Sequence, residues 1–358
     1  MDILRKYKKH LLMIAVALIV LLVVGLSWSI LKQPQRFEVR AGDSAVNNSL
    51  NAGDNKFDQS KVSPLSGVPC QNYQRRPVAV MISSDEVARP LSGLTSADLV
   101  VEMPVLLGGI TRMMAVFACD LPEEIGSIRS ARHDFIPLAQ GWDAIYAHWG
   151  GSHFALDQLS KKVIDDLDAL TNPYSVFYRK NTIAKPHNGF TSGERLLKTI
   201  DSIGFRQTAN LSGYLHQPTT ENNDHLDGVG VLSIGYPGIS KVEFKYDPTI
   251  NKYWRWRDKA KELDRNNLEQ VAAAAIVVVR AQSRYLEDQY NDVALDGQGQ
   301  CEVYQNGKRQ DCLWQKDRGD AKSQIRFTNS VGQDIKFVPG QMWIEIIEPD
   351  REVSWTTE

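Results

Sequence analysis

Two arginines stand close together behind a glycine in the segment IGSIRSARHDF, residues 125–135. The guanidinium groups of Arg129 and Arg132 offer donors in a planar fork that suits carboxylate or phosphate. Ser130 is placed to cap a helix that runs to Gln140. Both arginines would then flank a helix N-terminus, where free backbone N–H groups and the helix dipole favour an anion. The segment therefore predicts a local anion-binding site.

An internal network of ion pairs is the alternative explanation for these arginines. Buried arginines are normally paired with acids. Asp98, Glu102, Asp134 and Asp143 are all available as partners in the neighbouring sequence. The residue types alone leave both explanations open.

Histidines in the same part of the chain could act as general acids or bases; they are His133, His148, His153 and His187. They form neither an H-E-x-x-H motif nor a tight cluster. A metal site needs three or four ligands held together, so we predict no metal and no other cofactor. No serine lies in a G-x-S-x-G motif, and the sequence assigns no catalytic residue.

The segment Leu11 to Leu31 has 21 residues without a charge. It predicts that the residues discussed above lie outside the cytoplasm. A membrane-spanning helix needs about 20 residues. The preceding residues 1–10 contain RKYKKH, and basic flanks stay in the cytoplasm. We expect a single-pass membrane protein with a cytoplasmic N-terminus and an extracytoplasmic remainder. A cleaved signal peptide is the alternative, but its apolar region would be about 7–15 residues long.

The remaining chain divides by composition. The protein has 358 residues, which is enough length for two domains. Its formal net charge of -2 is too small in magnitude and of the wrong sign for a protein that binds nucleic acid or other polyanions in general. Residues 32–62 are polar and predict a flexible tether. Buried strands such as PVAVMI and AIYAHWG alternate with helical runs in residues 63–235, which predicts an α/β-type domain that carries the polar site. Residues 236–358 predict a β-rich domain with a hairpin around Asp247-Pro248, so the expected class is α+β behind a transmembrane helix.

The cysteines of an exported domain can be oxidised. In CEVYQNGKRQDC, Asn306-Gly307 is a preferred two-residue hairpin turn. Counting outward from the turn places Cys301 opposite Cys312 at a hydrogen-bonded pair, where Cα atoms lie about 5.5 Å apart and a disulfide can form. A second bridge, between Cys70 and Cys119, follows only by elimination.

Several of these segments resemble the YerB-like lipoprotein family, a bacterial domain of unknown function numbered 3048. The resemblance rests on RPVAVMI, ARPLSGLTSADLVVE, GGITRMMAVF, IGSIRSAR, DAIYAHWGGS and KPHN. VEFKYDPTINKYWR, AIVVVRAQ, QNGKRQDCLWQK and FVPGQMWIEII resemble its C-terminal part, so the match covers residues 63–349. The resemblance implies an exported, membrane-attached bacterial envelope protein and supplies no settled activity.

The resemblance also selects the candidate ligand-binding residues. A shared polar set on loops is better explained by a ligand or partner than by packing. The set comprises Arg89, Asp98, Glu102, Thr111, Arg112, Arg129, Ser130, Arg132, His148, Lys185, His187 and Asn188. The chain departs from the family pattern at Leu107 and at Ser83-Ser84, where relatives usually carry an acidic residue and Asp-Asn. Many members are anchored by a lipidated cysteine instead of a transmembrane helix.

Two functions follow as expectations. The first is a non-catalytic module that binds peptidoglycan, another anionic or glycan wall ligand, or a cell-wall enzyme through Arg112, Arg129 and Arg132. The second is a hydrolase or transferase that acts on an envelope polymer or a lipid-linked phosphate. There His148 or His187 would be the general acid or base, and the arginines would stabilise developing negative charge.

Overall fold

The computed structural model describes residues 61–106, 109–209, 211–218, 228–236, 241–288 and 290–357. The predicted cytoplasmic end, the transmembrane helix at Leu11 to Leu31 and nearly all of the tether lie outside these ranges. Within the described ranges, none of the helices has the length and apolar character needed to cross a membrane.

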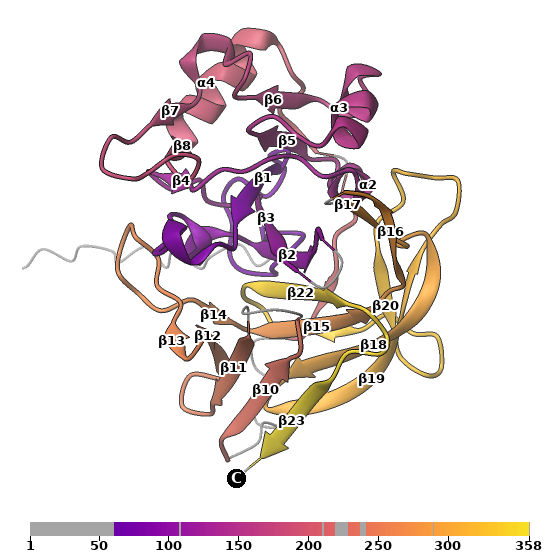
Figure 1. The fold of residues 1–358 in the computed structure, drawn as a ribbon. Helices are drawn as coiled ribbons and strands as arrows, with labels where there is room; N and C mark the ends of the chain where they lie inside the picture. The colour runs from indigo at the N-terminus through magenta and orange to yellow at the C-terminus, as the bar shows by residue number, and fades with distance from the viewer. Residues whose placement is uncertain are drawn as a thin grey trace, which may run out of the picture. The chain divides into compact units, whose positions relative to one another are not determined.

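Ten strands form the largest sheet, in the order β20-β19-β18-β15-β22-β2-β3-β1-β5-β6 (Figure 1). Its strands are β1 (Val78–Ser83), β2 (Leu99–Pro104), β3 (Thr111–Phe117), β5 (Ile145–His148), β6 (Asp166–Asp168), β15 (Ala275–Arg280), β18 (Gly297–Gln305), β19 (Lys308–Lys316), β20 (Arg326–Thr328) and β22 (Met342–Ile347). Parallel pairing joins β2 to β22, so strands from the predicted segments 63–235 and 236–358 are neighbours in one sheet. The boundary between the two segments stays a prediction.

A six-stranded sheet has the order β13-β12-β11-β10-β23, with β14 paired to β12. Its strands are β10 (Gly230–Ile234), β11 (Val242–Asp247), β12 (Lys252–Arg257), β13 (Ala260–Lys261), β14 (Ala272–Ala273) and β23 (Val353–Thr357). β11 and β12 form the hairpin predicted around Asp247-Pro248. Smaller sheets contain β4 (Ile125–Gly126), β7 (Tyr178–Arg179) and β8 (Gly189–Thr191), then β16 (Ser283–Glu287) and β17 (Tyr290–Val293), then β9 (Leu215–His216) and β21 (Lys336–Phe337).

Helices are short and few among the described residues. They are α2 (Ile136–Gly141), α3 (His153–Ser160) and α4 (Gly193–Ile203), with 3-10 turns η1 (Glu86–Ala88), η2 (Leu94–Ser96), η3 (His133–Phe135) and η4 (Pro173–Ser175). The many strands and few helices agree with the predicted mixed class and its β-rich second part. The helix expected to start at Ser130 was placed too early, since helical structure begins at His133. The backbone before it is extended because Arg129 N–H donates to Met81 O and Ala131 N–H to Gly150 O.

The central strands β1, β2, β3, β5, β15 and β22 of the large sheet are buried on both faces, which explains their mostly apolar sequences. In β1, Ala79 and Met81 belong to an apolar cluster that includes residues of α2 and α3. Val80 and Ile82 point the other way, into a second cluster with residues of α4 and of the six-stranded sheet. The sheet is therefore the middle layer of the described part.

A fully buried ion network connects β12 to the large sheet. Arg255 donates through Nε to Glu262 at 2.7 Å and through Nη1 to Glu345 of β22 at 2.5 Å. Its Nη2 donates to Glu102 of β2, and Arg257 Nη2 donates to the same Glu102 oxygen at 2.5 Å. Buried charges are tolerated only when paired and hydrogen-bonded in this way.

The network contains carboxyls with opposite pKa shifts. Burial raises the pKa of Glu345 to about 7, against the lowering effect of Arg255. Burial also raises the pKa of Glu262, but the positive charges of Arg257 and Arg255 outweigh this effect and hold the pKa of Glu262 at about 2. The two arginines thus share three acids, Glu102, Glu262 and Glu345, whose total negative charge nearly balances the positive charge of the arginines.

One disulfide joins two strands, and the other joins two loop segments. Cys301 of β18 is directly opposite Cys312 of β19, with Cα atoms 4.8 Å apart, so the predicted bridge and register are confirmed. Cys70 and Cys119 form the second bridge, with a Cα separation of 5.5 Å. All four cysteines of the sequence are therefore paired.

Replacing Glu102 by glutamine tests the ion network. The variant keeps the side-chain shape and removes a buried carboxylate that both arginines contact. We expect the free energy of unfolding in urea to fall by about 3–5 kcal/mol, because buried cations are left undercompensated. The matched control is Glu243→Gln on β11, whose half-buried carboxylate lies 3.7 Å from Lys245. The control should lose less than about 1 kcal/mol, and an equal loss in both variants contradicts the interpretation.

Candidate functional site

One carboxylate oxygen, Oδ2 of Asp85, lies among three of the predicted site residues. Its distances are 3.3 Å to Arg112 Nη1, 3.8 Å to Arg129 Nε and 3.7 Å to His187 Nδ1. Ser83 Oγ donates to the same oxygen at 2.7 Å. The structure therefore brings Arg112, Arg129 and His187 together around an acid that the sequence analysis did not select.

The ends of β1 and β3 position this group. Ser83, the last residue of β1, is paired with Arg112 near the start of β3. Arg129 lies beside β1 because its N–H donates to Met81 O at 2.9 Å. His187 is in the loop before β8, where its N–H closes a turn to Ala184 O at 2.9 Å.

Arg132 adds a third guanidinium. Its Cζ lies 5.1 Å from the centre of the Tyr290 ring, and no ion pair to a carboxylate is found for it within the described ranges. Burial, and next the like charge of Arg129, lowers the pKa of Arg112 to about 10; Arg132 contributes to the same repulsion. We call Asp85, Arg112, Arg129, Arg132 and His187 the arginine site.

Several buried nitrogens of the arginine site have no hydrogen-bond partner in the part of the chain that is described. They are the Nε atoms of Arg112, Arg129 and Arg132, and Nδ1 of His187. Buried polar groups in folded proteins are normally hydrogen-bonded. The Nε and Nη1 atoms of Arg257 in the buried ion network also lack a hydrogen-bond partner among the described residues, so these nitrogens distinguish the arginine site only together with its charge.

The charges of the site do not balance. Burial alone would raise the pKa of Asp85, but Arg112 and the Ser83 hydroxyl hold it below its usual value, so the carboxylate is charged at neutral pH. Burial lowers the pKa of His187, which is neutral at pH 7. The three arginines of the site thus outnumber its one carboxylate, which lies beside Arg112 and Arg129, and such an excess of positive charge suits the binding of an anion.

Glu102 and Thr111 belong to the buried ion network instead of the arginine site. Glu102 accepts from Arg255, Arg257 and the Thr111 hydroxyl. Thr111 precedes Arg112 in the chain, so the network holds the start of β3.

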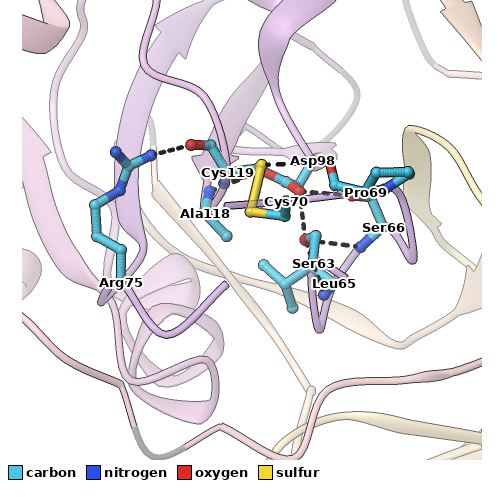
Figure 2. The surroundings of a disulfide bond; sticks show 9 residues. All are labelled: Ser63, Leu65, Ser66, Pro69, Cys70, Arg75, Asp98, Ala118 and Cys119. Carbon is cyan, nitrogen blue, oxygen red and sulfur yellow. Dashed lines mark hydrogen bonds between the residues drawn. A yellow bond between two sulfur atoms is a disulfide. The ribbon is translucent and has the colours of Figure 1, made fainter. Parts of the chain in front are cut away.

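Asp98 also has a structural position, beside the Cys70–Cys119 bridge (Figure 2). Its carboxylate accepts from the hydroxyls of Ser63 and Ser66 at 2.5 and 2.6 Å. It also accepts from the N–H groups of Ala118 and Cys119 at 2.8 and 3.0 Å. The carboxylate is buried and joins the SPLSG segment to the end of β3.

The histidine of β5 has protein partners on both ring nitrogens. His148 is fully buried, with Nδ1 2.8 Å from Gly150 O and Nε2 3.2 Å from Asp166. A general acid or base must reach a substrate proton, so among the two predicted histidines the geometry favours His187 over His148 for such a role.

The other predicted residues frame the site or stand apart from it. Arg89 donates to Ser84 O at 3.0 Å and pairs with Asp258 at 3.3 Å, so it holds the turn next to Asp85. Asn188 accepts from Arg179 and donates to Lys180 O, which closes the loop that carries His187.

Lys185 is exposed in that same loop, and Ser130 is half-buried. No hydrogen bond is found for the Ser130 hydroxyl within the described residues. The binding roles of all twelve residues stay predictions.

A metal ion could be held by His133, Asp134 and Asp292, whose ligand atoms lie within 4.8 Å of one another. His133 Nε2 is 3.3 Å from Asp134 Oδ1 and 3.6 Å from Asp292 Oδ1. Burial raises the pKa of Asp134 to about 7, although its Oδ1 accepts from Val293 N–H at 3.0 Å. The expected absence of a metal stays a prediction.

Asp85 was missed because the candidate residues were chosen from the family motifs and from positions close to glycines. Its position gave one usable signal. It follows the buried strand PVAVMIS by two residues, and polar groups at strand ends are placed to reach a site.

The raised pKa of Asp134 predicts a pH-dependent stability. In the unfolded chain this carboxyl has a pKa of about 3.9. The contribution of Asp134 to stability is therefore fully present below that pH and is lost as the pH rises to about 7. We expect the unfolding free energy of Asp134→Asn, minus that of the wild type, to increase across this range. The increase should reach up to about 1.4 kcal/mol per pH unit. Urea unfolding from pH 4 to 8 measures it, with exposed Asp157→Asn as the control, and a flat difference contradicts the assignment.

Comparisons with known proteins agree with the sequence resemblance. Residues 65–206 match the N-terminal domain, and residues 232–344 the C-terminal domain, of a protein of unknown function (DUF3048). The chain is 31% identical over 300 residues to "Putative lipoprotein YerB" of Bacillus subtilis (strain 168), covering 82% of this chain and 87% of that protein. The crystal structure of YerB protein from Bacillus subtilis matches with a TM-score of 0.74 at 30% identity, covering 82% of this chain and 99% of that one. The chain therefore belongs to the YerB-like DUF3048 family.

Proposed function

We propose that this protein is a non-catalytic module of the bacterial cell envelope that binds an anionic ligand at the arginine site. It acts outside the cytoplasm and is attached to the membrane. Its ligand is an anionic component of the wall, peptidoglycan included, or an acidic segment of a cell-wall enzyme.

The placement outside the cytoplasm is supported by two features. Both pairs of cysteines form disulfides, which persist in oxidising compartments. The similar protein of Bacillus subtilis is described as a lipoprotein, a class attached to the membrane surface. In this chain the predicted helix at Leu11 to Leu31 would provide the attachment.

The unbalanced charge of the arginine site is the observation that carries the proposal. Burial, and next the like charge of Arg129, lowers the pKa of Arg112, and the Arg132 guanidinium lies over the Tyr290 ring. Such repulsion works against folding, so stability alone does not account for the arrangement. An anionic ligand would relieve the repulsion and would satisfy the unpartnered Nε donors.

A hydrolase or transferase is the second candidate, because His187 belongs to the arginine site. Its Nδ1 lies 3.7 Å from Asp85, and its lowered pKa leaves the ring neutral and able to accept a proton. His187→Gln separates the two candidates. In an enzyme it would stop breakdown of wall material while binding continued, whereas in a binding module no breakdown occurs in either protein.

The double variant Arg129→Ala/Arg132→Ala tests the proposal. Full-length protein in non-ionic detergent would be sedimented with purified wall sacculi at several salt concentrations. We expect salt-sensitive binding by the wild type and at least about a tenfold loss in the variant, because charged hydrogen bonds contribute about 1.5–3 kcal/mol each.

The matched control is Arg206→Ala/Arg326→Ala, which removes two exposed arginines that pair with Asp143 and Asp334. This control should bind like the wild type. Circular dichroism would confirm that both double variants are folded. If the folded Arg129→Ala/Arg132→Ala protein binds sacculi normally, the proposed site is wrong.

A further inference from the structure

We infer that the arginine site is built for a dianionic phosphate group, such as a phosphomonoester or the end of a diphosphate, in preference to a carboxylate or a phosphodiester. This inference rests on the proposed function and specifies its ligand. It is argued from the number of charges, the spacing of the donors and the separation of the neighbouring acids.

The charge count favours a ligand with two negative charges. Arg112, Arg129 and Arg132 carry three positive charges, and Asp85 is the acid that pairs with this group within the described ranges. The net charge of the arginines and Asp85 is therefore two. A monoanion would leave one buried positive charge unbalanced, whereas a phosphomonoester would balance the site.

Asp85 does not satisfy the arginines. Its Oδ2 lies 3.3 Å from Arg112 Nη1 and 3.8 Å from Arg129 Nε, both longer than a charged hydrogen bond of about 2.7–2.9 Å. The Nε atoms of all three arginines remain unpartnered. A phosphate group has three terminal oxygens to share among three guanidinium groups, whereas a carboxylate has two.

Neighbouring acids are engaged elsewhere. Asp134 acts on Arg132 electrostatically, but its Oδ1 accepts from Val293 N–H and lies 3.3 Å from His133. Glu102 is held by Arg255 and Arg257. These acids therefore do not complete the pairing of the arginine site.

Methyl phosphate and dimethyl phosphate form a matched pair of probes. They differ by one methyl group and one charge, since the monoester loses its second proton near pH 6. Isothermal titration of the full-length protein in detergent at pH 6.5, where Asp134 is mostly protonated and methyl phosphate is mostly dianionic, would measure both without other oxyanions, with acetate as a third probe. We expect methyl phosphate to bind at least about tenfold more tightly than either monoanion.

Three variants complete the experiment. Arg129→Gln should weaken methyl phosphate binding more than about tenfold, and Asp85→Asn should strengthen it by removing the competing acid. Arg326→Gln, at the far β20 end of the large sheet, should have no effect.

The outcomes separate this inference from the proposed function. Equal binding of all three probes, lost in Arg129→Gln, would overturn the dianion inference and leave the anion site intact. If none of the probes binds, or if Arg129→Gln binds all of them normally, both are wrong.

A further titration, with dihexanoyl phosphatidic acid, tests whether the phosphate group belongs to a lipid. Tighter binding than methyl phosphate would assign the group to a lipid headgroup. Equal binding would assign it to a soluble or polymer-borne phosphomonoester. Either result supports the inference.

Discussion

The buried contact between Glu102 and the arginines of β12 connects the two largest sheets of the protein. It joins β2, in the middle of the large sheet, to the six-stranded sheet through Arg255 and Arg257. Glu102 also accepts the hydroxyl of Thr111, the first residue of β3. Arg112 comes next in the chain. The contact that holds the two sheets together therefore also fixes one of the three arginines of the site.

The two arginine clusters of the protein differ in how many acids balance their positive charge. In the buried ion network, Arg255 and Arg257 are matched by Glu102, Glu262 and a Glu345 whose pKa is about 7. In the arginine site, Asp85 lies beside Arg112 and Arg129, and Arg132 lies over the Tyr290 ring. Arg112 and Arg129 lie farther from Asp85 than Arg255 lies from Glu262 and Glu345. This contrast supports our proposal that the arginine site binds an anion.

Local signals predicted local structure well. The turn at Asn306-Gly307 fixed the register of β18 and β19 and thereby the Cys301–Cys312 bridge. Continuous apolar runs identified β1, β2 and β3. Predictions that depended on distant contacts were weaker. Glu102 and Asp98 looked like site residues because nothing local shows that Arg255 or Ser63 lies opposite them.

The strand KYWRWR shows why the ion network was missed. Its alternation buries Tyr253, Arg255 and Arg257, while the tryptophans between them are only partly buried. Hydropathy alone predicts the reverse, since tryptophan is far more apolar than arginine. The partners at Glu102 and Glu345 decide the outcome, and they lie far away in the sequence.

A crystal structure of the full-length protein grown with tungstate would show whether the arginine site binds a dianion. Tungstate is a tetrahedral dianion whose tungsten atom is located by anomalous scattering. Our account predicts an anomalous peak within hydrogen-bond reach of Arg112, Arg129 and Arg132, on the side away from Asp85. A structure at saturating tungstate in which each of these arginines is paired with a carboxylate of the protein, and no peak lies beside them, would contradict it.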